Sequence, residues 1–230
     1  MNLVKNLGRF AGLLYVVASI FGVFGLLYVP SKVIVHGNAS ATAHNIAGSE
    51  TLFSLGITSN LMGQALFIFV ALALYHLLKD VNRRHALAML ILILVAAPIA
   101  LLNELNAVAA LILVRGPDFL SVFDQPQRDA LAMLFLNLHG NGFTVAGIFW
   151  GLWLFPLGLL VYRSGFIPRI LGVLLMVGCF AYLANSFTSL VLPQYEAGVS
   201  RWASPLQAVE ILFMLWLLIV GAKPTPQAAV

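Results

Sequence analysis

The sequence predicts an all-α membrane protein with six transmembrane helices, and two observations lead to this fold class. Hydrophobic residues make up 61% of the 230 residues and charged residues only 9%, whereas a soluble domain carries roughly 25% charged residues to cover its surface. The hydrophobic residues also gather in six runs of about 20 residues, the length that crosses a bilayer core of ~30 Å. Backbone groups inside lipid have to bond one another, so each run is expected to form a helix.

The six predicted spans follow one another along the chain. They lie at about 10–29, 57–78, 86–112, 143–162, 170–191 and 206–222. The first follows Lys5 and Arg9 and resembles a signal peptide, but its apolar core of about 20 residues exceeds the roughly 7–15 residues of a signal core. Residues 1–223 are therefore expected to form a single polytopic transmembrane domain, and residues 224–230 a free tail.

The basic residues predict which ends of the spans face the cytoplasm. With both termini inside, eight Lys and Arg residues fall on the cytoplasmic side: Lys5, Arg9, Lys79, Arg83, Arg84, Arg163, Arg169 and Lys223. Four fall on the outer side: Lys32, Arg115, Arg128 and Arg201. Because cytoplasmic loops carry an excess of Lys and Arg, this distribution favours an N-in, C-in protein of the cell (inner) membrane.

The outer connections are expected to contain short interfacial helices. Asn38 precedes the segment ASATAHNIAGSE, which can form one of them. Asp124 and Gln127 have the spacing of a capping box and predict the start of a helix that continues to Tyr162. At over 30 residues this helix is longer than the bilayer is thick, so its first part is expected to project, lie in the interface or bend. The stretch SPLQ at 204–207 has the same capping pattern and predicts the start of the sixth span.

Polar side chains in five of the spans fall in the outer third of the membrane when depth is counted at ~1.5 Å per residue. Eight of them form the candidate ligand-binding site: Glu210, Glu104, His139, Asn185, Asn141, Asn103, Asn60 and Gln64. Polar groups in a span usually turn to the bundle interior, because facing lipid is costly. We therefore expect them to line a polar cavity open to the outside. Hydrogen bonding between helices is the alternative role of the amides, whereas Glu210 is the deepest charge and has no Lys or Arg at its depth.

The stretch LFLNLHGNGF at residues 134–143 places polar residues and two glycines in the fourth span. In an unbroken helix Asn137 and Asn141 share a face, and His139 points nearly the opposite way. Both faces can serve one cavity only where the helix unwinds, which Gly140 and Gly142 permit. An unwound backbone is tolerated at membrane depth only where it lines a cavity, so we expect a bend and a cavity wall here.

Seven stretches of the sequence, taken in order, are similar to a known family. They are GRFAGLLYV, PSKVIVHGNASATAHNI, SETLFSLGITSNL, YHLLKDVNRRHALA, LNLHGNGF, YRSGFIPRILGVLL, and ANSF followed by LPQY, and they cover roughly residues 5–196. In this order they resemble the bacterial integral-membrane family catalogued as domain of unknown function 4386. The resemblance implies a bacterial multi-pass membrane protein and supplies no activity, substrate or catalytic residue.

Three functions fit these residues. The first is binding or transport of a cation, a proton or a small polar molecule in the outward-facing cavity. The second is a structural or accessory role without a ligand, in which the polar residues serve packing. The third is an intramembrane enzyme, in which His139, Glu104 and Glu210 hold a metal ion or act as acid and base.

Known enzyme motifs are missing, which makes catalysis the less favoured function. The sequence has no HExxH, GxSxG, CxxC or Gly-rich phosphate loop, and no cofactor is predicted. The expected partners are the lipid bilayer and a small polar ligand or cation. Nucleic acid is not expected, because the Lys and Arg residues lie between spans and do not form one patch. Cys179 is the only cysteine, so no intrachain disulfide can form.

Overall fold

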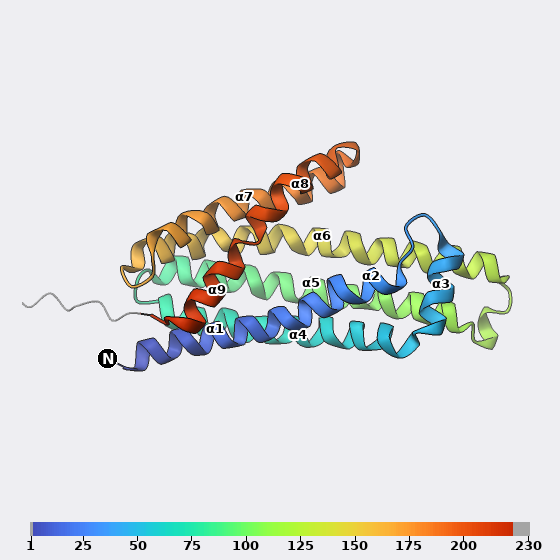
Figure 1. The fold of residues 1–230 in the computed structure, drawn as a ribbon, viewed down its shortest axis with the longest axis horizontal. Helices are drawn as coiled ribbons and strands as arrows, with labels where there is room; N and C mark the ends of the chain where they lie inside the picture. The colour runs from blue at the N-terminus through green and yellow to red at the C-terminus, as the bar shows by residue number, and fades with distance from the viewer. Residues whose placement is uncertain (1, 223–230) are drawn as a thin grey trace, which may run out of the picture. The chain divides into compact units, whose positions relative to one another are not determined.

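A computed structural model describes residues 2–222 of the chain, with side chains from residue 5 onward. All regular structure in this range is helical (Figure 1). The elements are α1 (Asn2–Val23), the π-helix η1 (Phe24–Tyr28), α2 (Val29–Val33), α3 (Ala39–Gly48), α4 (Glu50–Leu78), α5 (Arg83–Arg115), the 3₁₀-helix η2 (Asp118–Leu120), α6 (Gln125–Ser164), α7 (Arg169–Val191), the 3₁₀-helix η3 (Pro193–Tyr195), α8 (Glu196–Gln207) and α9 (Val209–Ile219). Lys223 and the predicted tail at 224–230 lie outside the described residues.

Six helical segments of the described chain are long and apolar enough to cross a membrane, which confirms the predicted fold class. They are Lys5–Val33, Glu50–Leu78, Arg83–Arg115, Gln125–Ser164, Arg169–Val191 and Pro193–Ile219. The first five each contain the span predicted for them. The largest group of additional residues is 125–142, the first part of α6, which the capping pattern at Asp124 and Gln127 predicts as helix.

The sixth span is built from two helices, and its predicted start at residues 204–207 was wrong. α8 already begins at Glu196, and α9 follows after Ala208. Ser204 lies inside α8, where its hydroxyl donates to the carbonyl of Ser200 (2.7 Å) and does not cap a helix. Pro205 has no N–H for the helical bond to the preceding turn, so α8 lacks one backbone hydrogen bond near its end at Gln207.

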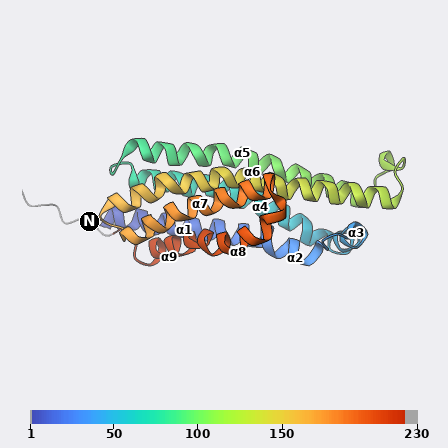
Figure 2. The same ribbon diagram turned by 90° about the horizontal axis from the view of Figure 1, so that it is seen from above.

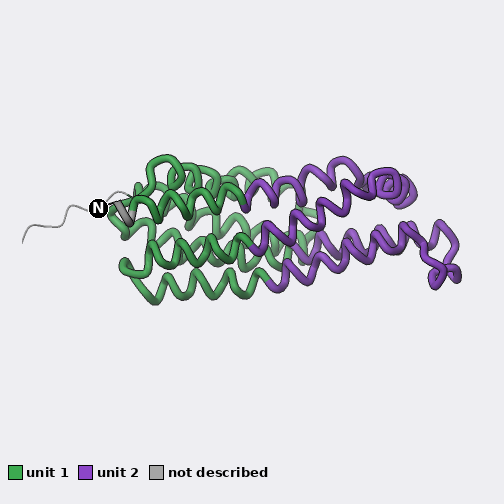
Figure 3. The backbone as a smooth tube through the Cα atoms, turned by 90° about the horizontal axis from the view of Figure 1, so that it is seen from below, with its two compact units in different colours: residues 1–17, 66–97, 144–230 green, residues 18–65, 98–143 purple. Residues whose placement is uncertain are grey.

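The chain forms two compact units, which Figure 3 shows in different colours. Unit 1 comprises residues 1–17, 66–97 and 144–230, and unit 2 comprises residues 18–65 and 98–143. Each boundary between them falls inside a helix, namely α1, α4, α5 or α6. The single transmembrane domain expected from the sequence stays a prediction.

Glycines let the helices of unit 1 approach one another closely. A Cβ on Gly151 of α6 would lie only 2.6 Å from the Cβ of Tyr182 in α7, and a Cβ on Gly12 of α1 would collide with the backbone of Leu218 in α9. Small residues in transmembrane helices commonly allow such backbone contact. α7 also lies beside α8, as Figures 1 and 2 both show.

Unit 2 has its own apolar core and well-capped helices. The core includes Ile46, Phe53, Leu111 and Leu136. The side chain of Asn38 accepts a hydrogen bond from the N–H of Ala41 at the start of α3, which confirms a helix in this segment. Asp124 and Gln127 exchange hydrogen bonds of 3.0 and 2.9 Å between side chain and backbone. This confirms the predicted capping box before α6.

Candidate functional site

Glu104 and His139 form a hydrogen-bonded pair inside unit 2. Glu104 lies on α5 and His139 on α6, and the imidazole Nε2 is 3.0 Å from the carboxylate Oε1. The Glu104 side chain is 2% exposed and that of His139 16%. Ionisable groups in membrane-spanning helices usually pair with one another, because an isolated charge there is costly. A proton between these two groups can sit on either partner, which makes the pair a neutral hydrogen bond or an ion pair.

Asparagine side chains of α5 hold the backbone that carries the histidine. The Nδ2 of Asn103 donates to the carbonyl of His139 (2.7 Å), and the Nδ2 of Asn106 donates to the Oδ1 of Asn103 (3.0 Å). The His139 ring also packs edge-on against Phe143, with centroids 4.9 Å apart. A Cβ on Gly142 would collide with the buried Asn103 side chain. Gly142 is therefore needed for the close approach of α5 and α6.

α6 does not unwind at its glycines, so this expectation from the stretch LFLNLHGNGF was wrong. Residues 125–164 form one α-helix. His139 faces Glu104, while Asn137 and Asn141 are exposed on another face of α6. Glycine permits unwinding without requiring it, and here Gly142 serves packing within an intact helix.

The second oxygen of the Glu104 carboxylate is buried, and it has no hydrogen-bond partner among the described residues. Nearly all buried polar atoms in proteins have a partner, and an unsatisfied one costs about 1–3 kcal/mol. This Oε2 atom is therefore a place where a proton, a water molecule or a small polar group can bind.

Asn60 lies in the same unit, on α4 against the π-helix η1. Its side chain is 4% exposed, and a Cβ on Gly25 of η1 would collide with its amide. The hydroxyl of the neighbouring Ser59 donates to the carbonyl of Phe21 (3.0 Å), which bonds α4 to α1 at this level. Gln64 follows one turn later on α4 and is half-buried. The position of Asn60 agrees with a role in helix packing.

Glu210 lies in unit 1, where two tyrosines bind its carboxylate. Tyr15 of α1 donates to Oε2, and Tyr182 of α7 donates to Oε1 at 2.9 Å. Hydrogen bonds to a charged group are stronger than those between neutral groups. Two phenol donors therefore explain how a glutamate is accommodated in an apolar helix where no Lys or Arg of residues 5–222 pairs with it.

Neither Tyr15 nor Tyr182 was among the site residues predicted from the sequence. A tyrosine hydroxyl inside a bundle usually finds a partner, and this was the signal available. The ring of Tyr15 packs against Phe67 of α4 (5.3 Å) and Trp153 of α6 (6.2 Å), and these two rings contact each other (5.3 Å). Trp153 is fully buried, and its indole N–H has no partner within the described part of the chain. Aromatic side chains thus pack around the Tyr15 ring of the tyrosine–glutamate cluster.

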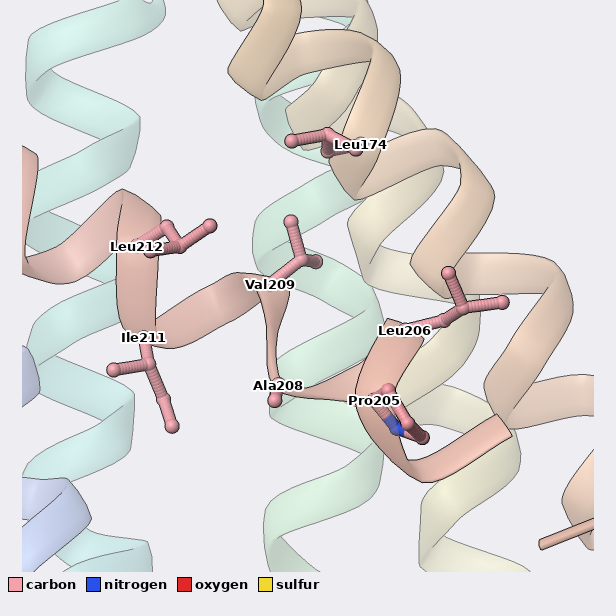
Figure 4. A pocket seen from close by; sticks show the side chains of 7 residues that line it. All are labelled: Leu174, Pro205, Leu206, Ala208, Val209, Ile211 and Leu212. Atoms are coloured by element: carbon pink, nitrogen blue, oxygen red, sulfur yellow. The ribbon is translucent and has the colours of Figure 1, made fainter. Parts of the chain in front are cut away.

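The break between α8 and α9 lies directly before Glu210. Ala208 connects the two helices, and Glu210 occupies the first turn of α9. A negative charge is favourable there, because the free N–H groups at a helix start carry partial positive charge. Figure 4 shows an apolar hollow of about 400 Å³ at this break, which is lined by Leu174 of α7 and by Pro205, Leu206, Ala208, Val209, Ile211 and Leu212.

The predicted site residues divide between the two units. In unit 2 the structure brings together Glu104, His139 and Asn103, places Asn60 and Gln64 along α4, and leaves Asn141 exposed. In unit 1 Glu210 bonds to its tyrosines, and Asn185 of α7 accepts from Ser200 of α8 at 2.6 Å. That all eight residues line one cavity stays a prediction.

The chemistry of these clusters is that of acids, bases and hydrogen bonds. Within residues 2–222 no three His, Cys, Asp or Glu side chains are grouped closely enough to hold a metal ion. The Glu104–His139 pair combines the two side-chain types that most often exchange protons in proteins.

Comparison with known proteins supports the resemblance noted in the sequence. The family model described as "Domain of unknown function (DUF4386)" matches residues 10–221. An uncharacterized protein of Archaeoglobus fulgidus is 27% identical over 188 residues, which cover 81% of this chain and 89% of that protein. This relative is archaeal, so the bacterial origin implied by the resemblance stays a prediction. No solved structure matches the chain. The chain belongs to the family of domain of unknown function 4386.

Proposed function

We propose that this membrane protein binds and releases a proton at the Glu104–His139 pair, in a polar cavity open to the outer side of the membrane. The environment of the Glu104 carboxylate is the observation that carries the proposal. The Glu104 side chain is 2% exposed, its Oε1 contacts the imidazole of His139, and its Oε2 has no partner among the described residues. An imidazole and a carboxylate can both gain and lose a proton, which is the chemistry that the proposal requires of this pair.

The surrounding side chains support a proton more than a larger cation. Inorganic cations require several oxygen ligands at once. The amide of Asn103, which neighbours Glu104 in the sequence, is already bonded to His139 and Asn106. A proton needs only the two members of the pair.

Protonation of the pair changes the attraction between two helices. Asn103 holds the backbone at His139, and Phe143 packs against the ring, so the imidazole can exchange a proton without leaving Glu104. The pair is an ion pair in one protonation state and carries a single charge after gaining or losing a proton. The contact between α5 and α6 is therefore sensitive to pH, which gives the protein a means of responding to it.

Infrared difference spectroscopy between acidic and neutral pH tests this proposal on the purified protein. The C=O stretch of a buried carboxylic acid is separated from that of a hydrated one. We expect the wild-type protein to show a pH-dependent band of buried acids, and Glu104→Gln to lose the part of this band that Glu104 contributes. Glu210→Gln identifies the part that comes from Glu210, which is bonded to Tyr15 and Tyr182. Glu196→Gln is the matched control, because Glu196 is exposed and bonded to Ser189, and it should keep the band.

Two results would contradict the proposal. One is the absence of a buried-acid band from the wild-type spectrum throughout the pH range. The other is a band that persists unchanged in Glu104→Gln. His139→Gln provides a further check, because loss of the imidazole should move the band if the two groups share a proton.

A structural role is supported for Glu210 by a different observation. Both of its carboxylate oxygens are bonded to tyrosines of two other helices, α1 and α7. We propose that Glu210 ties these helices to the start of α9, where the break after α8 removes continuous helical bonding. In this proposal Glu210 has a structural role in helix packing, and Glu104 binds the proton.

A further inference from the structure

An apolar groove runs between α1 and α4 in unit 1. Leu7, Phe10 and Leu14 of α1 form one wall, Phe69, Leu72 and His76 of α4 line the other, and the hollow measures about 340 Å³. Phe10 and Phe69 are 53% and 58% exposed. The groove is therefore open along its length, and its walls belong to helices that can span a membrane.

The two helices run antiparallel along this groove. The ring of Tyr15 packs against Phe67, and from there the groove extends to Leu7 on α1 and His76 on α4. Each helix rises ~1.5 Å per residue. Lys79 therefore lies about one turn beyond His76, at the end of the groove where α1 carries Lys5.

Basic residues dominate this end of the groove. Segments 1–17 and 66–97 contain five basic residues, Lys5, Arg9, Lys79, Arg83 and Arg84, and one acidic residue, Asp80. Arg83 and Arg84 are exposed, while the guanidinium of Arg9 donates to the carbonyl of Ile219 (3.0 Å). An apolar groove that ends among basic residues is complementary to a molecule with a long apolar chain and an anionic head group.

We propose that this groove binds an anionic phospholipid, with one acyl chain between α1 and α4 and its phosphate beside Lys5 and Lys79. Basic pockets next to transmembrane helices attract anionic head groups. His76 lies where the acyl chain of the bound lipid would meet its head group. The positive charge selects an anionic over a zwitterionic lipid, and the apolar walls require the acyl chain.

Native mass spectrometry of the purified full-length protein tests the proposal. Phosphatidylglycerol and phosphatidylcholine with identical acyl chains are added separately, and the lipid retained per protein chain is measured. We expect severalfold more phosphatidylglycerol than phosphatidylcholine on the wild type. Lys5→Gln/Lys79→Gln should lose this preference, and the control Arg201→Gln, at an exposed position on α8, should keep it.

Two further experiments distinguish lipid binding in the groove from binding to surface charge alone. Leu72→Trp fills the groove and should reduce retention of phosphatidylglycerol while leaving all basic residues in place. Excess glycerol phosphate should not displace the lipid. Equal retention of the two lipids by the wild type, an unchanged preference in Lys5→Gln/Lys79→Gln, or displacement by glycerol phosphate would each overturn the proposal.

Discussion

His139 and Asn141 are two residues apart on α6, yet their surroundings differ completely. His139 contacts the buried Glu104, whereas Asn141 is exposed. Helical geometry predicted from the sequence that the two could not face one cavity in an intact helix. Which of them faces α5 could not be predicted, because this depends on how Gly142 and Asn103 fit together.

The tyrosine bonds to Glu210 are expected to stabilise unit 1 measurably. Tyr182→Phe removes one donor and leaves Glu210 with a single phenol partner. Hydrogen bonds to charged groups contribute about 1.5–3 kcal/mol in soluble proteins, and bonds between membrane helices average nearer 0.6 kcal/mol. We expect the free energy of unfolding in detergent to fall by roughly 1–2 kcal/mol, measured by denaturant titration.

Tyr195→Phe is the control for this substitution, because Tyr195 is 61% exposed. It should leave the free energy of unfolding within about 0.5 kcal/mol of the wild type. A double substitution with Glu210→Gln should cost less than the two single changes added together, since both remove the same bond. Full additivity would mean that the two side chains do not interact.

At the scale of elements, local sequence patterns predicted helix starts well where no tertiary contact competes. The capping pair Asp124 and Gln127 sets the start of α6, and Asn38 caps α3. The same pattern at residues 204–207 failed, because α8 packs along α7 and continues through it. The π-helix η1 was not predicted either, since its widened turn depends on the fit of Gly25 against Asn60.

The two glycines of α6 should respond differently to the same substitution. A Cβ on Gly140 meets nothing within 4 Å, whereas one on Gly142 collides with Asn103. Replacing glycine by alanine inside a helix gains up to about 1 kcal/mol where space allows. We therefore expect Gly140→Ala to leave stability unchanged or raise it, and Gly142→Ala to lower the unfolding temperature.

The proposed proton binding at Glu104 predicts a spectroscopic effect of Gly142→Ala as well. Displacing Asn103 frees the backbone carbonyl of His139, so the infrared band assigned to Glu104 should shift in this variant and remain in Gly140→Ala. Equal stabilities and equal spectra for the two alanine variants would show that α5 and α6 do not approach closely at Gly142.

At the scale of the whole molecule, hydropathy and length predicted the number of spans and located the first five, but they missed the start of the sixth. They were not sufficient to pair the polar residues, because hydropathy yields depth along a helix and not its rotation. The partners of Glu210 show this most clearly: Tyr15 and Tyr182 lie in apolar runs, and only the packing of α1 and α7 against α9 brings their hydroxyls to the carboxylate.

The N-in, C-in orientation is tested by labelling single cysteines in intact cells. In a Cys179→Ala background, Val122→Cys lies between α5 and α6 at a position that is 81% exposed, and Asn82→Cys lies between α4 and α5. The excess of basic residues predicts that the connection between α4 and α5, which contains Asn82, lies inside. A membrane-impermeant thiol reagent should therefore label only Val122→Cys. Labelling of Asn82→Cys alone would reverse the orientation and place the predicted cavity on the cytoplasmic side.

The central claim, that Glu104 and His139 share a proton, is tested most directly by nitrogen NMR of the His139 ring. The protein is labelled at histidine, and the ring signal of His139 is assigned through His139→Gln and followed across a pH series in wild type and Glu104→Gln. We predict that the Nε2 signal differs between the two proteins, because Nε2 has no carboxylate partner in Glu104→Gln. Identical His139 ring signals in both proteins throughout the series would contradict the claim.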